Sequence, residues 1–433
     1  MNNIYWLIFL VSLSCSFVQP QGSYEMATCR LQEVDNSGVT GTVYIYLKDT
    51  QKNQYDLSIK VEGVQGSDGN REIAVLEYAN FTHPGMIFTT DATKTYSCPE
   101  GSPTPTTMEG SLGNVNVVSN KIDQTKPYYQ QFTLQGDKSL IGRLFVLKKS
   151  ASNCTKYNDV DPILASCVLG IANGQFIPVG NPAGSVYTSG AINQATSTSA
   201  MLTRAVCKLT GILGNNVTGW VYFDENGTFI RVSANEIKGL NMTMAHGIHI
   251  HQYGDITLTN GTSVGGHWKT GSQTHGLPPS TTRELGDLGN ICAYDYNGDA
   301  YYQYQTDYMG QISGQDFGTI IGHSVVIHIQ RDNGTLDSYS SRVSQCVIGY
   351  ERNTNQTPLF PKRIDLSTTP QCDKITVAPN PSTTGTTGTT SSTSTTTGPS
   401  STTTSTTTGT ASAAMSFSIF LLSTSFFINF FCL

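Results

Sequence analysis

The sequence predicts an all-β fold, either a sandwich or a barrel. Short runs of β-branched and aromatic residues recur along the chain, for example at 43–46, 220–223 and 325–327, and Gly, Asn and Asp interrupt them. Asn297-Gly298 lies between two such runs, and this pair favours the positive φ angles of a tight hairpin turn. No long amphipathic helical pattern accompanies these runs.

Composition excludes one large class of function. Only 13% of the 433 residues are charged, and the formal net charge is −6. Proteins that bind nucleic acid need a basic face, which this balance does not supply. We therefore expect no nucleic-acid partner.

The folded part of the chain is a tandem repeat. Four pairs of segments match at an offset that stays between 175 and 180 residues. They are 27–31 with 205–209, 113–115 with 289–291, 139–143 with 319–323, and 167–170 with 346–349. The repeats are expected to be two domains, 23–171 and 201–352, joined by a linker at 172–200 that is rich in Gly, Asn, Ser, Thr and Ala.

Further segments lie before and after the two repeats. Residues 1–22 contain a short apolar run followed by polar residues, as in a cleaved signal peptide. An extension at 353–378 follows the second repeat. The next segment, 379–412, is almost entirely Thr, Ser, Gly and Pro, so it cannot bury enough apolar surface to fold. It is expected to be a disordered, O-glycosylated stalk.

The C-terminal segment resembles an attachment signal for a glycosylphosphatidylinositol (GPI) anchor. Small residues precede a hydrophobic tail, 413–433, and Gly409 or Ser412 would be the attachment residue. A C-terminal membrane helix is the alternative, although the apolar run 417–433 is short for one. We expect a protein held at the outer cell surface by a GPI anchor.

Cysteines and sequons agree with export. Eight of the ten cysteines lie outside the signal peptide and the tail, and an even number in an oxidising compartment implies disulfides. Eight N-x-Ser/Thr sequons predict N-glycosylation. They begin at Asn80, Asn153, Asn216, Asn226, Asn241, Asn260, Asn333 and Asn355.

The segment 246–255, HGIHIHQYGD, carries the strongest chemical signal. His249 and His251 are separated by one residue, so in a strand both imidazoles project from one face, where a single metal ion can bind both. Imidazole pairs suit copper and zinc, and copper has the higher intrinsic affinity. Further candidate residues follow in the order His267, His275, Glu284, Asp287, His328 and Arg342.

In order and spacing, these residues over about 203–350 closely resemble the copper/zinc superoxide dismutase family. The resemblance implies two tandem Greek-key β-barrel or sandwich domains. It implies that Arg342 guides superoxide to the metal and that His267 bridges copper to zinc. The implied copper ligands are His249, His251, His267 and His328, and two further implied zinc ligands are His275 and Asp287. The implied activity is dismutation of superoxide to dioxygen and hydrogen peroxide by Cu(II)/Cu(I) cycling in the second repeat.

The chain departs from the family pattern in three places. Glu284 stands where the family has another zinc histidine, and only thirteen residues separate His328 from Arg342. The loop 260–263 lacks the cysteine that usually anchors the subunit disulfide. The first two departures resemble the copper-only branch of the family, so we expect copper and no requirement for zinc.

Two roles remain open for the carboxylates of the second repeat. Glu284 and Asp287 could form a nitrogen/oxygen zinc site with His275. They could instead accept a hydrogen bond from the second nitrogen of His267 and so orient it.

The first repeat is expected to hold no metal. Ala74, Leu76, Ser111 and Lys148 occupy the positions of His249, His251, Asp287 and His328. His83, its only histidine, is expected to lie in a loop. The first repeat is therefore interpreted as a metal-free scaffold.

Two histidines of the second repeat are assigned no metal. His246 is expected to brace the end of its strand. His323 lies five positions before His328, an odd spacing in a strand, so we expect it to point away from the site and to be exposed.

The resemblance also implies disulfides, because the first and last strands of the family's barrel are neighbours. The implied pairs are Cys29 with Cys167 and Cys207 with Cys346. Cys346 comes four residues after Arg342, one further than the family's disulfide cysteine, so its side chain can face the other way.

Two questions stay open at this level. The oligomeric state is unknown, and pairing of the two repeats with each other could replace the usual dimer. A cell-surface copper-binding or structural glycoprotein with little turnover is the alternative function. Arg342 favours turnover, because a storage site needs no guide for a substrate.

Overall fold

The computed structural model describes residues 26–98, 106–136, 138–174, 204–226, 229–241, 245–269, 272–278, 280, 282–293, 300–306, 320–335 and 341–352. In these ranges the chain is all-β apart from one short 3₁₀ helix, η1 (Thr262–Val264). The expected signal peptide, most of the linker, the extension, the stalk and the tail lie outside the described residues. No helix within the described residues is long and apolar enough to cross a membrane.

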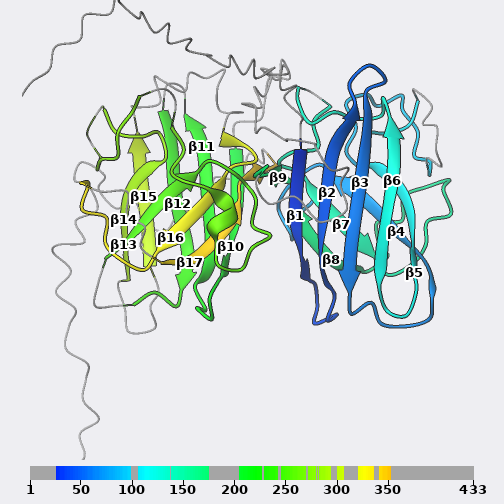
Figure 1. The fold of residues 1–433 in the computed structure, drawn as a ribbon, viewed down its shortest axis with the longest axis horizontal. Coiled ribbons are helices and arrows are strands. Elements are labelled where there is room, and N and C mark those ends of the chain that lie inside the picture. Colours follow the sequence, from blue (N-terminus) through cyan, green and yellow to red (C-terminus); the bar gives the residue numbers. More distant parts are fainter. Residues whose placement is uncertain are drawn as a thin grey trace, which may run out of the picture. The chain divides into compact units, whose positions relative to one another are not determined.

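The first repeat forms one twisted antiparallel sheet that curls into a barrel (Figure 1). Among the described residues its strands run in the spatial order β5-β4-β7-β8-β1-β2-β3-β6, and β9 pairs with β1. The strands are β1 (Met26–Glu33), β2 (Thr40–Asp49), β3 (Gln54–Glu62), β4 (Gly69–Leu76), β5 (Ser111–Val117), β6 (Ile122–Tyr129), β7 (Leu144–Lys148), β8 (Ile163–Val168) and β9 (Gly170–Ile171).

The second repeat forms a closed barrel. In its described part the order is β11-β12-β15-β14-β13-β16-β17-β10, and an additional β10–β11 pairing closes the ring, while β18 pairs with β10. The strands are β10 (Arg204–Gly211), β11 (Thr218–Asn226), β12 (Phe229–Lys238), β13 (Ala245–His251), β14 (Asp287–Ala293), β15 (Ala300–Thr306), β16 (Ser324–His328), β17 (Arg342–Val347) and β18 (Gly349–Tyr350). Both repeats thus have the all-β barrel architecture that the sequence predicts.

Alternating burial explains why these segments are strands. In β2 the side chains of Val43, Ile45 and Leu47 face the core, and the residues between them are only partly buried. Such alternation is typical of a strand with one buried face. In β7 and β16, by contrast, all five residues are buried. These two strands therefore run through the best-protected part of each repeat.

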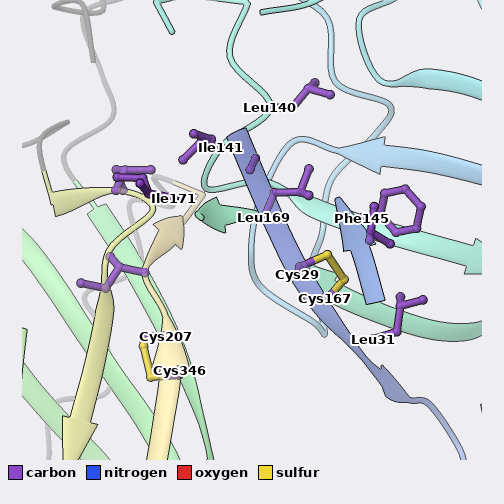
Figure 2. Packing of buried hydrophobic residues seen from close by; sticks show 14 of the residues in the cluster. Cys29, Leu31, Leu140, Ile141, Phe145, Cys167, Leu169, Ile171, Cys207 and Cys346 are labelled. Atoms are coloured by element: carbon purple, nitrogen blue, oxygen red, sulfur yellow. A yellow bond between two sulfur atoms is a disulfide. The ribbon is translucent and has the colours of Figure 1, made fainter. Parts of the chain in front are cut away.

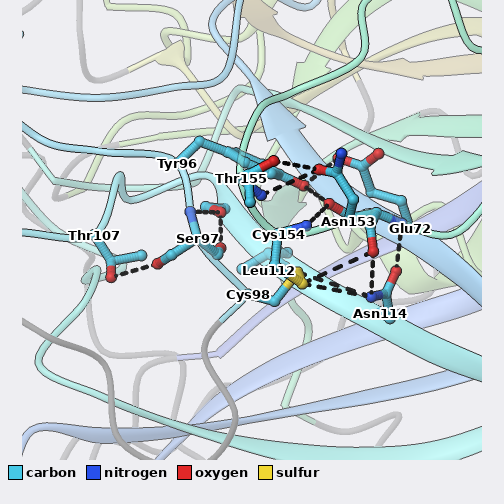
Figure 3. Close-up of a disulfide and its surroundings, with 12 residues drawn as sticks. Glu72, Tyr96, Ser97, Cys98, Thr107, Leu112, Asn114, Asn153, Cys154 and Thr155 are labelled. Atoms are coloured by element: carbon cyan, nitrogen blue, oxygen red, sulfur yellow. Dashed lines mark hydrogen bonds between the residues drawn. A yellow bond between two sulfur atoms is a disulfide. The ribbon is translucent and has the colours of Figure 1, made fainter.

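Disulfides connect strands within each repeat. Cys29 is bonded to Cys167, and Cys207 is bonded to Cys346, the two pairs that the family resemblance implied (Figure 2). A third bond, which no sequence argument assigned, joins Cys98 to Cys154. Beside it, Asn114 donates from Nδ2 to the backbone oxygen of Ser152 (Figure 3). This third bond ties the segment that follows β7 to the loop before β5.

The two repeats lie in one compact unit and contact each other through matching backbone groups. The backbone N–H of Ile171 donates to Gly322 O (2.9 Å), and that of Tyr350 donates to Gly142 O (2.8 Å). Ile171 and Tyr350 hold equivalent positions in the two repeats, as do Gly142 and Gly322. The contact therefore has approximate two-fold symmetry, like the interface of a homodimer.

Apolar side chains pack closely along the same contact. A Cβ atom added to Gly142 would lie 2.1 Å from Cγ2 of Ile321, and one added to Gly322 would lie 2.3 Å from Cγ2 of Ile141. One cluster of buried hydrophobic residues contains members of both repeats, such as Leu169 and Ile171 of the first and Cys346 of the second (Figure 2). Glycine is required at both positions because any side chain would collide with the other repeat.

Candidate metal centre

Pairing between β13 and β16 brings the first imidazoles together. His249 lies opposite Val326, and His251 lies opposite Ser324. Both histidines are buried, with exposed fractions of 0% and 1%. His328 is the last residue of β16. His267 lies in the loop between β13 and β14, where it forms an isolated β-bridge with His251. Two adjacent strands and one loop therefore supply the four histidines.

The ligand atoms of these four histidines converge. One nitrogen from each of His249, His251, His267 and His328 lies within 4.8 Å of the others. The Nε2 atoms of His251 and His328 are 3.2 Å apart. The rings of His249 and His267 are stacked, with centroids 4.0 Å apart. All four side chains are buried, so the cluster is preorganised.

In three of these histidines one ring nitrogen is hydrogen-bonded to an acceptor outside the group of four. His251 donates from Nδ1 to Gly265 O (3.0 Å), and His267 donates from Nδ1 to Asp287 Oδ1 (2.9 Å). His249 donates from Nε2 to Asp332 Oδ2 (2.9 Å), which leaves its Nδ1 buried without a hydrogen-bond partner. Unpartnered polar atoms are rare in protein interiors. Copper prefers imidazole nitrogens, and a buried nitrogen without a partner beside three other imidazoles suits a metal ion, so this donor set fits copper.

A second cluster adjoins the first and shares His267. One ligand atom from each of His267, His275, Glu284 and Asp287 lies within 4.8 Å of the others. Asp287 Oδ1 is 2.9 Å from His267 Nδ1 and 3.0 Å from His275 Nδ1. Glu284 Oε2 lies 3.3 Å from His267 Nδ1, and its Oε1 pairs with Lys269 Nζ at 2.8 Å. The structure therefore brings together the residues for which the sequence left two roles open, zinc binding or hydrogen bonding to His267.

Asp332 connects the two clusters, and sequence reasoning missed it. Its carboxylate is fully buried and lies 2.9 Å from both His249 Nε2 and His275 Nε2. Asn290, in β14, holds this aspartate by accepting from its backbone N–H (2.8 Å). A possible signal in the sequence was the Asp-Asn-Gly turn that starts four residues after His328.

Burial and charge divide the histidines into two groups. Burial lowers the pKa of His249 to about 4, and it lowers the pKa of His251 well below the ordinary value, so both are neutral near pH 7. Burial also lowers the pKa of His267 and His275, but the neighbouring carboxylates outweigh it. The pKa of His267 therefore lies above its ordinary value, and that of His275 is about 10.

The carboxylates show the reciprocal shift. Burial raises the pKa of Asp287, but hydrogen bonds from His267 and His275 lower it to about 2. In the same way, His249 and His275 hold the pKa of Asp332 well below its usual range. The carboxylate cluster is therefore ionised and attracts positive charge, whether from imidazolium or from a metal ion.

Arg342 lies beside the imidazole cluster. It begins β17 opposite His328, and its charge is one of the causes that lower the pKa of His251. Its guanidinium donates to the backbone oxygens of Gly261 and Gly265, the latter at 2.6 Å. Two backbone acceptors on one loop therefore fix the orientation of this cation.

The structure corrects one expectation and explains another. His323 is not exposed: only 9% of it is accessible, its Nδ1 lies 3.0 Å from His251 O, and its ring packs on Trp268. The odd spacing turns His323 away from the cluster, but toward protein instead of solvent. His246 braces its strand, since its Nδ1 bonds to the backbone oxygen of His328 (2.9 Å).

Cys346 faces the core, where it meets Cys207. The residue three positions after Arg342 is Gln345, whose Nε2 donates to the backbone oxygens of Ile256 (3.5 Å) and Leu258 (3.4 Å). A side-chain amide thus reaches the loop that a disulfide anchors in the family.

The corresponding region of the first repeat contains no such cluster among its described residues. Lys148 occupies the place of His328 and is fully buried, with its Nζ 4.1 Å from the ring centroid of Tyr157. The same Nζ donates to the backbone oxygen of Asn158. His83 lies in an exposed turn. A cation and an aromatic ring replace the imidazoles.

Comparison with known proteins leads to the same class of protein. The family model described as copper/zinc superoxide dismutase (SODC) matches residues 217–348. The chain is 29% identical over 354 residues to extracellular superoxide dismutase [Cu-Zn] 3 of Dictyostelium discoideum, covering 79% of this chain and 82% of the relative. It is 34% identical over 171 residues to superoxide dismutase [Cu-Zn] of Paramecium bursaria Chlorella virus 1, covering 37% of this chain and 88% of the relative.

A second Dictyostelium protein, extracellular superoxide dismutase [Cu-Zn] 2, is 27% identical over 368 residues, covering 80% of this chain and 82% of that relative. The two Dictyostelium alignments are longer than one repeat. The chain belongs to the copper/zinc superoxide dismutase family.

Proposed function

We propose that this protein is an extracellular copper-dependent superoxide dismutase whose active site lies in the second repeat. The convergence of four buried imidazoles next to the anchored Arg342 carries the proposal. His249, His251, His267 and His328 would hold the copper. Bound copper would supply one-electron chemistry, oxidising one superoxide to dioxygen as Cu(II) and reducing a second as Cu(I).

The residues of the chain have two tasks in this reaction. Arg342 attracts the superoxide anion and donates hydrogen bonds to it, because its guanidinium is permanently charged. His267 supplies a proton, since formation of hydrogen peroxide consumes protons. Its Nδ1–H stays bonded to Asp287 Oδ1, which leaves Nε2 to carry the transferred proton.

We further propose that the enzyme works with copper alone. In the copper/zinc enzymes zinc orients the bridging histidine, and here Asp287 already accepts a hydrogen bond from His267 Nδ1. Glu284 replaces a nitrogen ligand by a carboxylate that is paired with Lys269. A fixed carboxylate can orient an imidazole in the same way as a metal ion.

The first repeat is proposed to be catalytically silent, and the mature protein is proposed to be a GPI-anchored glycoprotein. The relatives named extracellular superoxide dismutases support export. Three of the described sequons, at Asn153, Asn260 and Asn333, have exposed asparagines whose Oδ1 accepts from the threonine hydroxyl two residues later. Asn80 differs because its Nδ2, the atom that would carry a glycan, donates to Glu351 (3.0 Å).

Release of active enzyme from cells by phosphatidylinositol-specific phospholipase would support the proposed GPI anchor, and release by detergent alone would contradict it.

Superoxide decay, followed directly by its absorbance, tests the proposed activity. The secreted ectodomain, about residues 23–378, is loaded with copper and compared with His251→Ala and with His83→Ala. We expect fast decay that is lost in His251→Ala and kept in His83→Ala. A copper-loaded protein that does not speed up decay would favour the alternative function of a surface copper-binding glycoprotein.

A further inference from the structure

The end of the first repeat touches the loop that leads into the metal centre. Asn173 follows β9 closely and is 5% exposed. Its backbone N–H donates to Asp255 Oδ2 (3.2 Å), and its Nδ2 donates to Ser263 O (2.9 Å). Asp255 and Ser263 are both fully buried. The backbone N–H and the side chain of Asn173, two residues after the end of the first repeat, therefore bind the two ends of a loop in the second repeat.

This loop, 255–265, is folded onto itself. The carboxylate of Asp255 accepts from the backbone N–H of Thr257 (3.1 Å), and the hydroxyl of Ser263 donates to Asp255 O (2.5 Å). Gly261 and Gly265 have φ angles of 74° and 76°, a left-handed conformation that favours glycine. Such a loop has few alternative conformations, so a contact at one point can fix the whole loop.

The far side of the loop holds the active-site groups. Gly261 O and Gly265 O accept from the guanidinium of Arg342. Gly265 O also accepts from Nδ1 of His251, whose Nε2 lies 3.2 Å from Nε2 of His328. The two carbonyl groups lie two residues to either side of Ser263. A shift of Ser263 would therefore move the acceptors that orient Arg342.

The Asn173 contact does not repeat on the other side of the pseudo-two-fold axis. The backbone hydrogen bonds between the repeats occur in equivalent pairs, such as Gly254 N–H to Ile171 O (3.0 Å) and Ala79 N–H to Tyr350 O (2.7 Å). The residue equivalent to Asp255 is Asn80, which bonds to Glu351 instead. The side-chain bonds of Asn173 thus occur on the side where the loop carries a metal centre.

We propose that Asn173, which lies just after the first repeat, is a positioning residue for Arg342, acting through the loop 255–265. This inference rests on the proposed function, because it assigns the metal-free repeat a role in guiding the anion to copper. Asn173 itself contacts neither copper nor substrate. It holds the loop so that the two carbonyl groups keep the guanidinium beside the imidazole cluster.

A double-mutant cycle on the full-length protein separates this role from simple stabilisation. Asn173→Ala removes the side-chain amide donor but keeps the backbone N–H. Arg342→Ala removes the guanidinium that Asn173 is proposed to position. The matched control is Gln32→Ala, because Gln32 Nε2 also crosses between the repeats, to Thr210 Oγ1 (2.8 Å), but does not touch the loop. The readouts are azide binding to Cu(II), followed by absorbance, and superoxide decay, both at known copper content.

We expect Asn173→Ala to weaken azide binding about three- to five-fold, the scale of one buried hydrogen bond, with copper content unchanged. In the Arg342→Ala background the same substitution should have no effect, because coupled residues are not additive. Gln32→Ala should match the native protein. Asn173→Leu, which is similar in size and has no donor, should behave like Asn173→Ala.

Three results would overturn the inference: unchanged azide affinity in Asn173→Ala, an equal loss in both backgrounds, or native affinity in Asn173→Leu. Failure of the proposed dismutase function would give a different set of results from failure of this inference. In that case the native protein binds copper and azide but does not speed up superoxide decay, and the azide cycle still decides the role of Asn173.

Discussion

At the scale of single residues, hydrogen bonds to one ring nitrogen determine which nitrogen each histidine could offer to a metal ion. Asp332 accepts from Nε2 of His249, so Nδ1 is the nitrogen that His249 could offer to a metal. Gly265 O accepts from Nδ1 of His251, so this histidine could offer Nε2. Alternate positions in one strand bring both rings to one face, but the two rings present different nitrogens. Preorganised tautomers of this kind lower the reorganisation that metal binding requires.

Arg342→Ala should lower the rate of dismutation about ten-fold, or about 1.4 kcal/mol on the barrier, without loss of copper. The arginine acts on the anion and not on the metal. Increasing ionic strength should slow the native enzyme more than the variant, because salt screens an attraction that the variant has already lost. Superoxide decay over a range of salt concentrations measures both effects.

The control for this variant is Lys238→Ala, which removes one exposed positive charge on β12. It should leave the rate and its salt dependence close to native. Equal rates for the native protein and Arg342→Ala would argue against turnover at this site and for copper storage.

His323 makes the stability of the protein depend on pH. Burial lowers its pKa to about 4, whereas an unfolded chain binds the proton at about pH 6.5. Below that value the unfolded state takes up more protons, so stability should fall as the pH drops from 6.5 to 4. The contribution of this one residue is about 3 kcal/mol at pH 4 relative to pH 7.

His323→Gln, which does not titrate, should remove that part of the acid sensitivity. Thermal unfolding of the metal-free protein at pH 7 and pH 4.5 measures it. The unfolding temperature of His323→Gln should fall less from pH 7 to pH 4.5 than that of the native protein. A native protein and a variant with parallel pH profiles would mean that His323 is accessible to protons in the folded state.

Order and spacing along the chain predicted the residues that the structure brings together at the candidate metal centre, because each of them lies on or beside a strand with fixed register. Asp332 was not found, since it lies in a turn that approaches His249 and His275 only in the folded chain. The burial of His323 was missed for a related reason. Alternation shows which face of a strand a residue is on, but not whether a loop covers the other face.

At the scale of elements, strands place the imidazoles and loops complete the site. β13 and β16 set the spacing of three histidines, while the loop before β14 brings His275, Glu284 and Asp287 together. The barrel strands were predictable from their β-branched and aromatic runs. The contacts of Gln345 with the loop 255–265 were not, because a glutamine gives no sign of its partner in the sequence.

Zinc should not be required by this arrangement of loops. Copper-loaded protein should show the same dismutation rate before and after addition of one equivalent of zinc, because Asp287 already orients His267. The matched variant is Glu284→His, which restores the nitrogen donor of the zinc-binding members and should make the rate respond to zinc. A severalfold rise in the native protein on addition of zinc would show that the second cluster is a working zinc site.

At the scale of the whole molecule, one chain contains both halves of a dimer-like contact. Glycines at equivalent positions and paired backbone hydrogen bonds join a metal-free repeat to the repeat that carries the imidazoles. The duplication was visible in the sequence as a constant offset. The pairing of the two repeats depends on complementary surfaces, and single residues such as Gly142 do not reveal it until the fold is known.

The metal content of the secreted ectodomain tests the central claim most directly. Only the second repeat brings four imidazoles together within the described residues, so the protein should bind close to one copper per chain. His249→Ala combined with His251→Ala should abolish that binding, while Lys148→Ala in the first repeat should leave it unchanged. Copper near two per chain, or copper retained by the double variant, would contradict the account.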